Sequence, residues 1–458
     1  MFGKILIANR GEIAVRVART CRELGIKTVA VYSTADRDST VVRLADHAVH
    51  IGSPPAKRSY LSLPAIIEAA RVTGAEAVHP GYGFLSEDPD FAEVCAENDL
   101  VFIGPRPEVM KRLGDKAATR ALMQAAGLPL LPGTVAPVAS ATEARAAAEK
   151  IGFPIILKAV AGGGGRGISI VRSAADLAEA FQRTRANTRA VFGDGRLYLE
   201  RYLLQARHVE VQVLCDTHGN GVSLGDRDCS AQRRHQKLVE EAPAPNLPEV
   251  TRTEMSAAAI RGAQAAGFTG AGTMEFLIDS AGSFYLMEMN ARLQVEHPVT
   301  EMVTGIDLVE QQIRVAAGER LGFGQQDVTI TGSAVECRIN TEDPGRGFLP
   351  TPGTLERFEP PGGPFTRVDT HAFAGYVIPP YYDSLLAKLV VWAPSRPAAI
   401  TRMSRALDEL VMSGPGVCTT TSFAAEIVEN PLFRAARHTT DLVDKIITGR
   451  ADLETARR

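Results

Sequence analysis

Two glutamates stand in segments that a β-hairpin would bring together. Glu275 and Glu288 each lie in a short apolar run, and Ser-Ala-Gly-Ser at 280–283 suits a four-residue hairpin loop. A hairpin that pairs residue 279 with residue 284 also pairs the two glutamates, and like charges in that position are destabilising. A divalent cation reverses the sign of that interaction, and two carboxylates with ATP phosphates suit Mg²⁺. The alternative is a solvated face on which the two side chains splay apart.

The residues after Glu288 favour the site over the solvated face. Apolar side chains occupy alternate positions of 284–295, which predicts one strand with one apolar face. The opposite face carries Glu288, Asn290, Arg292, Gln294 and Glu296. A plainly solvated face rarely needs Asn, Arg and Gln between two glutamates.

A glycine-rich segment at 161–167 joins two apolar strand signals, 155–160 and 168–171. It does not open a helix and lacks Gly-Lys-Ser/Thr, which excludes a Walker-type loop. Its backbone N–H groups could approach phosphate oxygens, with Lys158 adding a positive charge. A flexible hairpin is an equally open interpretation of the glycine run alone.

Hydrogen-bonding side chains are dense at 226–237. Charge runs are usually solvated loops, but Gln, Arg, His and Lys within six residues suit contacts to an anion or nucleotide. Farther on, Glu336, Arg338 and Asn340 share a face of a predicted strand, where a guanidinium could stabilise a developing oxyanion. A surface ion pair of Glu336 with a neighbour is the alternative there.

The elements that must position these residues begin with alternating strand and helix signals over 4–103. This alternation predicts a parallel, doubly wound sheet with ligands beyond the carboxyl ends of its strands. The first turn, at 9–12, lacks Gly-x-Gly-x-x-Gly, which argues against a dehydrogenase. His-Pro-Gly-Tyr-Gly-Phe at 79–84 follows another strand signal and forms a tight turn at that edge.

The rest of the chain divides into three regions. Residues 104–130 predict a helical connection, 131–203 mixed strands and helices, and the region from about 204 a larger α+β domain. Strands are predicted in that last region at 209–215, 272–278, 284–295 and 333–339.

Composition excludes several classes of protein. Of 458 residues 45% are hydrophobic and 22% charged, with a net charge of −3, as in an ordinary globular protein without an electrostatic footprint for nucleic acid or membrane. No stretch approaches a transmembrane span, and the N-terminus predicts a strand rather than a signal peptide. The six dispersed cysteines favour neither disulfides nor zinc, so we expect a cytoplasmic protein.

Five motifs together resemble biotin carboxylase, an ATP-grasp ligase. They are HPGYGFLSE at 79–87, RDCSAQRRHQK at 227–237, EMNARLQVEHPVTE at 288–301, ECRIN at 336–340 and PPYYDS at 379–384. The resemblance implies a three-domain ATP-grasp fold of the α/β and α+β classes. It implies a Rossmann-like domain (1–113), a helical linker (114–130), a mobile lid (131–203), a C-terminal catalytic α+β domain (204–446) and a tail (447–458).

The resemblance also implies a reaction. ATP phosphorylates bicarbonate to carboxyphosphate, and the carboxyl group then passes to N1′ of biotin on a carrier protein. ATP would be held by Lys116, Lys158, Gly162, Gly163, Gly164, Gly165, Glu200, Leu203, His208, Gln232 and His235. Two Mg²⁺ or Mn²⁺ ions would be held by Glu275, Glu288 and Asn290. Arg292 would orient bicarbonate, and Glu296 would be its general base. Lys237 would stabilise carboxyphosphate, and Arg338 would stabilise the biotin enolate. The residues that border bicarbonate or biotin would be Gln294, Val295 and Tyr82.

The resemblance implies partners as well. The chain has no Ala-Met-Lys-Met sequence, so we expect a biotinyl carrier protein and a carboxyltransferase as separate partners, with the final acceptor (acetyl-CoA, propionyl-CoA or pyruvate) selected elsewhere. Arg19, Glu23 and Arg367 fit a family homodimer contact, near which Pro364 replaces a common Phe. Ala161, Arg201 and Thr420 also depart from the family pattern. An ATP-grasp ligase with another acceptor and a silent ATP-binding subunit remain the alternatives.

Overall fold

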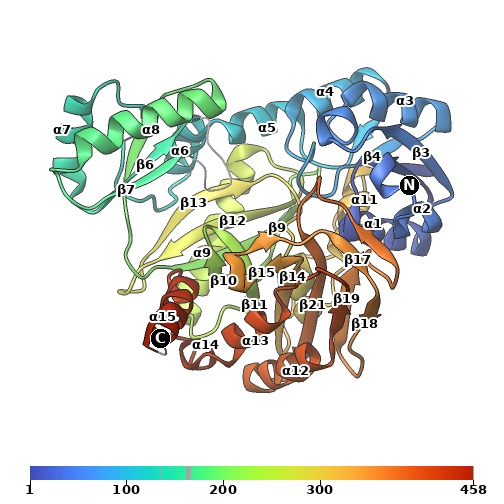
Figure 1. Cartoon of the computed structure of the whole chain (residues 1–458). Coiled ribbons are helices and arrows are strands. Elements are labelled where there is room, and N and C mark those ends of the chain that lie inside the picture. Colours follow the sequence, from blue (N-terminus) through green and yellow to red (C-terminus); the bar gives the residue numbers. More distant parts are fainter. Residues whose placement is uncertain (135, 161–166, 457–458) are drawn as a thin grey trace.

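The computed structural model describes residues 1–134, 136–160 and 167–456 of the chain. The N-terminal part is a five-stranded sheet in the order β3-β2-β1-β4-β5, with parallel pairing throughout (Figure 1). Its strands are β1 (Lys4–Ile7), β2 (Lys27–Ser33), β3 (His47–Gly52), β4 (Ala77–His79) and β5 (Val101–Phe102). The predicted parallel sheet is confirmed.

Helices cover both faces of this sheet because successive strand side chains point to opposite sides. Ile5 and Ile7 pack with α1 (Gly11–Glu23), whereas Leu6 packs with α3 (Leu63–Thr73) and α4 (Pro89–Glu97). The short α2 (Thr40–Leu44) lies on the α1 side through its Val41.

Two helices lead from this sheet to a smaller unit with a core of its own. They are α5 (Pro107–Gly114) and α6 (Lys116–Ala125), where a helical connection is predicted. The unit contains α7 (Ala141–Ile151), β6 (Ile155–Ala159), β7 (Ile168–Val171), α8 (Leu177–Phe192) and β8 (Leu197–Arg201). Its antiparallel strands run in the order β7-β6-β8, and Figure 1 shows the unit standing apart at the upper left.

An eight-stranded antiparallel sheet forms the rest of the molecule, in the order β13-β12-β9-β10-β11-β14-β21-β19. Its strands are β9 (Arg207–Cys215), β10 (Gly221–Arg233), β11 (Gln236–Ala242), β12 (Gly270–Ile278), β13 (Phe284–Asn290), β14 (Ser333–Asn340), β19 (Thr366–Thr370) and β21 (Leu385–Ala393). The predicted strands at 209–215, 272–278 and 333–339 are confirmed, with small extensions at their ends.

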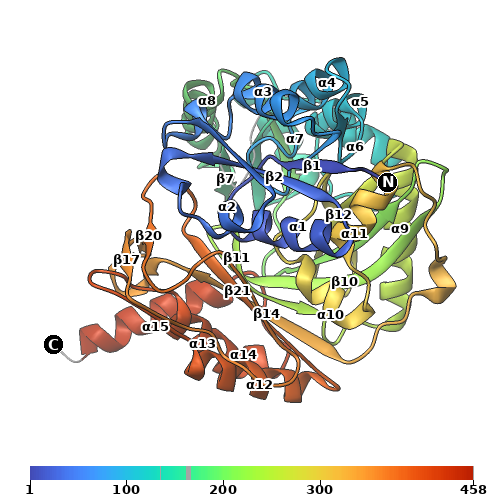
Figure 2. The same cartoon turned by 90° about the vertical axis from the view of Figure 1, so that its right-hand side faces the viewer.

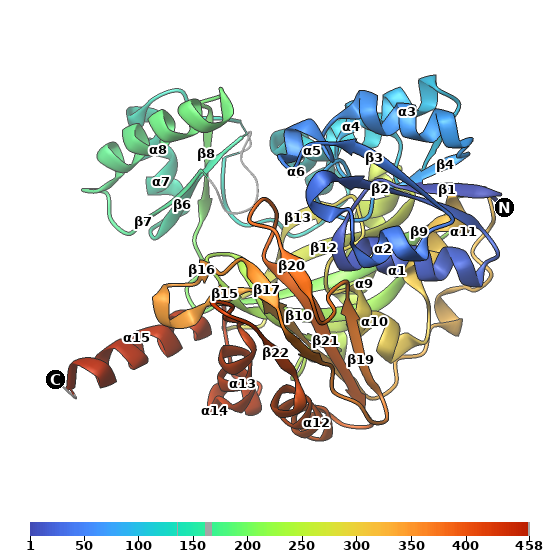
Figure 3. The same ribbon diagram turned by 45° about the vertical axis from the view of Figure 1, so that its right-hand side comes forward.

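The two faces of this sheet differ in chemistry. One face is apolar: it packs on α9 (Glu249–Ala266), α12 (Arg396–Glu409) and α13 (Thr421–Glu429), and Figure 2 shows α12 and α13 on the side away from the N-terminal strands. The other face meets α10 (His297–Thr304) and α11 (Leu308–Ala316). In Figure 3 the N-terminal unit and the smaller unit both stand above the large sheet.

Short elements complete the chain. They are β15 (Glu342–Asp343), β16 (Leu349–Pro350), β17 (Gly353–Leu355), β18 (Arg357–Glu359), β20 (Tyr376–Ile378), β22 (Val411–Ser413), α14 (Pro431–Arg434), α15 (Leu442–Ala456) and the 3₁₀ turns Thr34–Asp36, Ala56–Arg58, Gln325–Asp327 and Pro344–Arg346. In the part of the chain that the structure describes, no helix combines the length and apolarity that crossing a membrane requires.

The hairpin register predicted for β12 and β13 is wrong at the loop and right at the glutamates. Phe284 pairs with Ile278 rather than with Asp279, whose carboxylate instead accepts bonds from the loop N–H groups of Ala281 and Ser283, each at 2.9 Å. A register shift between Phe276 and Glu275 then adds one residue on β13. That β-bulge restores the pairing of residue 275 with residue 288.

One further expectation is corrected, and one alternative interpretation is excluded. The predicted strand 284–295 ends at Asn290, because the chain bends there to enter α10 and its period-two pattern does not continue in the sheet. Most of the dense segment 226–237 lies in β10 and β11 rather than in a solvated loop. Arg234 and His235 form the tight turn between them, with φ values of 48° and 67° that suit a two-residue hairpin.

Candidate active site

A row of charged side chains crosses four strands on the polar face of the large sheet. Arg227 of β10 lies opposite Glu210 of β9, which lies opposite Glu275 of β12. Glu275 in turn lies opposite Glu288 of β13. Burial and the charge of Glu275 raise the pKa of Glu288. Three adjacent carboxylates are unstable without cations beside them.

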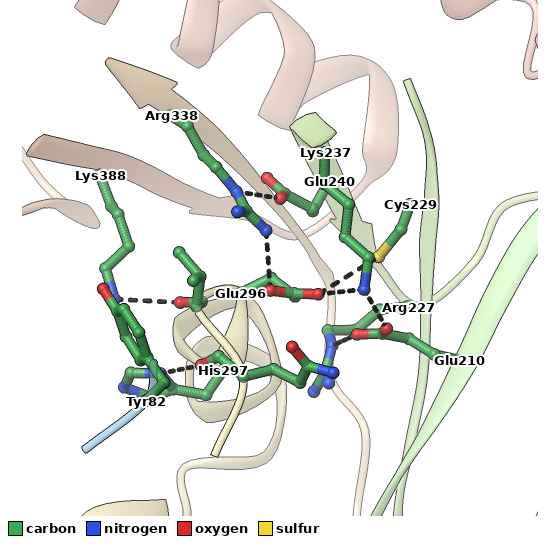
Figure 4. A network of polar contacts seen from close by, with 12 residues as sticks. Tyr82, Glu210, Arg227, Cys229, Lys237, Glu240, Glu296, His297, Arg338 and Lys388 are labelled. Atoms are coloured by element: carbon green, nitrogen blue, oxygen red, sulfur yellow. Dashed lines mark hydrogen bonds and ion pairs between the residues drawn. The ribbon is translucent and has the colours of Figure 1, made fainter. Parts of the chain in front are cut away.

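Lys237 supplies one such cation. Its Nζ lies 2.6 Å from Glu210 Oε2 and 2.5 Å from Glu296 Oε1 (Figure 4). It also lies 3.1 Å from Glu275 Oε1. Burial opposes its charge, but these carboxylates raise the pKa of Lys237 well above its ordinary value. His208 Nε2 lies 3.0 Å from Glu275 Oε2. Burial also opposes the charge of Glu275, yet Lys237 and His208 together lower its pKa.

Glu296 is fully buried just before α10 and is held at both carboxylate oxygens. Lys237 binds Oε1, and Arg338 Nη2 lies 2.8 Å from Oε2. Burial disfavours the charged form, but these two cations hold the pKa of Glu296 well below its usual range. Arg338 also places Nε 2.5 Å from Glu240 Oε1 (Figure 4).

The segment that leaves β13 turns polar side chains toward Glu275. Asn290 and Gln294 donate to Glu275 Oε1 at 2.8 and 3.0 Å. Arg292 donates to Gln294 Oε1 at 2.8 Å and to Glu87 Oε2 at 2.9 Å. Glu87 comes from the loop after β4, so this contact joins the N-terminal unit to the large sheet.

The smaller unit contributes a second group of charges. Glu200 of β8 pairs with Lys158 of β6 and with Arg120 of α6. Burial lowers the pKa of Lys116, while Glu288 favours and Lys158 disfavours its charge. Lys116 therefore interacts electrostatically both with the carboxylate row, through Glu288, and with the smaller unit, through Lys158.

Tyr82 and Lys388 lie side by side at the edge of the site (Figure 4). The buried Lys388 donates to the main-chain oxygen of Val295 at 3.0 Å and lies 5.8 Å from the centre of the Tyr82 ring. The Tyr82 hydroxyl donates to Glu12, with which Lys388 also pairs at 3.2 Å.

Comparison with known proteins decides the family. Residues 1–110 match the model of the biotin carboxylase N-terminal domain, 115–323 that of the carbamoyl-phosphate synthase L chain ATP-binding domain, and 336–445 that of the biotin carboxylase C-terminal domain. The chain belongs to the biotin carboxylase family. It is an ATP-dependent ligase with the ATP-grasp fold.

Individual relatives of this family cover nearly the whole chain. Biotin carboxylase of Nostoc sp. is 51% identical over 445 residues, which span 97% of this chain and 99% of that one. Biotin carboxylase of Pseudomonas aeruginosa is 50% identical over 434 residues, which span 94% of this chain and 96% of that one. A crystal structure of a biotin carboxylase–βγ-ATP complex from Campylobacter jejuni matches with a TM-score of 0.94 and 47% identity, over 97% and 99% of the two chains.

A second solved structure names further ligands. It is the biotin carboxylase domain dimer of Hydrogenobacter thermophilus 2-oxoglutarate carboxylase, in complex with MgADP, ADP and bicarbonate. It matches with a TM-score of 0.94 and 47% identity, over 97% of this chain and 98% of that one.

Most side chains that the sequence singles out for biotin carboxylase chemistry converge in the structure. The carboxylate row, the Lys237 cluster, the 290–296 segment and the Lys158–Glu200 pair form one polar region. Gln232 is buried on β10 opposite Lys237, and burial and the charge of Lys158 lower the pKa of His235. Leu203 is half-buried just after β8. Gly162–Gly165 and Ala161 lie outside the described residues.

Several site residues escape sequence reasoning. Glu210, Glu240, Glu87 and Arg120 each bind a residue predicted for the site. A signal exists for three of them: Glu210 follows His208 by two positions on a strand, Arg120 follows Lys116 by four positions on a helix, and Glu87 ends the motif at 79–87. The alternative interpretation of Glu336 as part of a surface ion pair does not hold, because Glu336 is fully buried and neither carboxylate oxygen has a hydrogen-bond partner among the described residues.

Two residues that depart from the family pattern, Arg201 and Thr420, make hydrogen bonds with the main chain. Arg201 donates to the main-chain oxygen of Ile151 at 3.0 Å. The Thr420 hydroxyl accepts from the N–H of Asn340 at 2.9 Å and donates to the main-chain oxygen of Arg338. Thr420 therefore ties α13 to the end of β14, which carries a candidate catalytic arginine.

The donor set fits Mg²⁺ or Mn²⁺. Glu275 and Glu288 offer hard oxygen ligands side by side, and burial together with the charge of Glu275 raises the pKa of Glu288, which a cation between them would oppose. Lys116 and Lys158 carry positive charge on the side where nucleotide phosphates would bridge to such ions.

Proposed function

We propose that this chain catalyses the ATP-dependent carboxylation of biotin by bicarbonate, through carboxyphosphate, with the side chains named above in the roles that follow. The observation that carries the proposal is the buried Glu296 carboxylate held between Lys237 and Arg338. Such an arrangement places a base between one cation suited to a phosphorylated anion and another suited to an acceptor oxyanion.

ATP binds between the smaller unit and the large sheet in this proposal. Lys116 and Lys158 hold its phosphates, with Gly162–Gly165 closing over them, and Glu200, Leu203, His208, Gln232 and His235 line the nucleoside. The Lys158–Glu200 ion pair supports the proposal, because an incoming phosphate can replace the carboxylate as the partner of Lys158. We keep the predicted domain limits, with 131–203 as the lid.

Glu275, Glu288 and Asn290 hold the divalent ions, which neutralise charge on the transferring phosphoryl group when bound. Arg292 orients bicarbonate from its position beside Gln294, Asn290 and Glu87. Val295 and Tyr82 border the biotin side of the site.

Glu296 takes the proton of bicarbonate, so that the bicarbonate oxygen can attack the γ-phosphate of ATP. Two cations on Glu296 make it a weak base in the substrate-free chain. Its basicity rises when oxygens of bound bicarbonate or of the ATP γ-phosphate draw Lys237 away and the ureido oxygen of biotin draws Arg338 away. Proton abstraction is thereby coupled to the presence of substrates.

The phosphate that leaves carboxyphosphate takes the N1′ proton of biotin, Arg338 stabilises the resulting biotin enolate, and the carboxyl group passes to N1′. The biotin is carried on a separate biotinyl protein, and a carboxyltransferase passes the carboxyl group to an acyl-CoA or to pyruvate. We propose a homodimer in the cytoplasm, built on the pocket of about 390 Å³ that Arg16, Arg19, Glu23 and Arg367 help to line.

ATP hydrolysis by the purified chain with Mg²⁺ and bicarbonate, with and without free biotin, tests the proposal. Bicarbonate-dependent turnover that biotin stimulates is the expected result. Turnover indifferent both to biotin and to a biotinylated carrier domain would favour another acceptor for the same ATP-grasp site. ATP binding without turnover would favour a silent subunit.

A further inference from the structure

The Arg338 guanidinium is fixed by two carboxylates from different elements. Glu240 of β11 binds Nε at 2.5 Å, and Glu296 before α10 binds Nη2 at 2.8 Å. Glu240 lies opposite Glu336, two residues before Arg338 on β14, so Glu240 and Arg338 are diagonal neighbours across the two strands. Diagonal neighbours are within reach of long side chains.

The two carboxylates differ in what the reaction does to them. Glu296 gains a proton when it acts as the base, and a protonated carboxyl no longer pairs with a guanidinium as an ion. Glu240 is fully buried and touches neither bicarbonate nor phosphate in the proposed arrangement. Among the described residues, Glu240 is therefore the carboxylate that continues to hold Arg338 through the second half of the reaction.

We propose that Glu240 is a positioning residue for biotin carboxylation: it holds Nε of Arg338 so that the terminal guanidinium nitrogens stay aimed at the biotin oxyanion after Glu296 has taken its proton. This inference rests on the proposed function. The bond to Nε fixes the plane of the guanidinium and leaves Nη1 and Nη2 for ligands.

The neighbouring Glu336 supports this role for Glu240. Both Glu336 oxygens and Glu240 Oε2 are buried and have no hydrogen-bond partner in the described parts of the chain. Burial, together with the nearby charge of Glu240, raises the pKa of Glu336 well above its usual value. Burial also raises the pKa of Glu240, to about 7, although the charge of Arg338 opposes that rise. Because Glu240 binds Arg338 and Glu336 has no hydrogen-bond partner among the described residues, Glu336 is a matched control in the same sheet.

The test compares Glu240→Gln with Glu336→Gln in two assays. One assay is bicarbonate-dependent ATP cleavage without biotin, and the other is carboxylation of biotin. We expect Glu240→Gln to lower kcat for biotin carboxylation at least tenfold and ATP cleavage without biotin less than threefold, with Glu336→Gln within twofold of wild type in both. Glu240→Asp, which keeps the charge but shortens the side chain, should lose carboxylation to a smaller extent.

A double-mutant cycle separates positioning from a general structural role. If Glu240 acts through Arg338, Glu240→Gln should cause no further loss of carboxylation in an Arg338→Gln background. Additive losses, or equal losses in both assays, would overturn the inference, as would wild-type carboxylation by Glu240→Gln. If neither biotin nor the carrier stimulates ATP turnover by the wild-type chain, the proposed function is overturned together with this inference. If the wild type is stimulated and Glu240→Gln carboxylates biotin at the wild-type rate, only the positioning role is overturned.

Discussion

Lys237 Nζ lies 2.5 Å from Glu296 Oε1, so the candidate base of the site is neutralised by the residue proposed to receive the phosphorylated product. The pair is buried and shares its surroundings with Glu210 and Glu275. Removal of one partner from a buried pair of this kind lowers the free energy of unfolding by several kcal/mol, because the other partner is left as an uncompensated buried charge. The arrangement therefore restrains Glu296 until a bound anion competes for Lys237.

Glu296→Gln keeps the shape of the side chain but removes the base. We expect bicarbonate-dependent ATP cleavage to fall about 100-fold to 10,000-fold, which is the range of general-base contributions, while ATP affinity changes little. Single-turnover ATP cleavage and equilibrium nucleotide binding measure the two effects. Glu254→Gln, an exposed site on α9, is the control. Near-normal turnover in Glu296→Gln would remove Glu296 from the mechanism.

Arg338→Ala separates the two halves of the reaction. Its guanidinium is assigned to the biotin enolate, so carboxylation of biotin should fall much further than ATP cleavage without biotin. The variant also leaves Glu240 and Glu296 without their cation, so a thermal melt must accompany the kinetics. Equal losses in both reactions would indicate that Arg338 maintains structure rather than catalysis.

Local spacing was enough to predict the pairing of Glu275 with Glu288 but not how the chain achieves it. Phe284 pairs with Ile278 rather than with Asp279, which shifts the register by one residue. A bulge between Glu275 and Phe276 reverses this shift, so that Glu275 still pairs with Glu288. A bulge has no simple sequence signal here, because either residue beside it would suit a regular strand. The end of β13 at Asn290 was missed for a similar reason: alternation continues in the sequence after the backbone has turned away.

Long-range partners lay beyond sequence reasoning. Glu240 and Glu336 are 96 positions apart and become register partners only because β14 joins the sheet beside β11. In the same way, Glu87 reaches Arg292 from a different unit. Family motifs identified Arg338, Arg292 and Glu296, and one of them ends at Glu87, but they did not predict the contacts that Glu87 and Glu240 make, since those depend on how the sheets are assembled.

Glu288→Gln tests the metal site. Burial and the charge of Glu275 raise the pKa of Glu288, so protons compete more strongly with Mg²⁺ for this carboxylate and Mg²⁺ binding should weaken as the pH falls. We expect the variant to lose Mg²⁺-dependent ATP turnover by about 100-fold or more. The shift in Tm that MgATP causes in wild type should also shrink. An unchanged response of Tm and turnover to Mg²⁺ would exclude Glu288 as a ligand.

The buried His371 makes the free energy of unfolding depend on pH, and a single substitution can test this contribution. It is 3% exposed, and burial, reinforced by the charge of Arg10, lowers its pKa to about 3. In the unfolded chain a histidine titrates near pH 6.5, so between those values the unfolded state binds a proton that the folded state does not. By linkage, this residue therefore reduces the free energy of unfolding by up to about 1.4 kcal/mol for each unit that the pH falls below 6.5.

His371→Asn removes that dependence, although the substitution itself destabilises the packed site at pH 7. The difference in Tm between wild type and variant should therefore narrow from pH 7 to pH 5, because only the wild type loses the histidine contribution. Thermal melts at half-unit steps of pH measure the trend. His47→Asn, at an exposed position on β3, should show a constant difference. A gap for His371→Asn that stays constant or widens at low pH would mean that His371 is protonated within the fold.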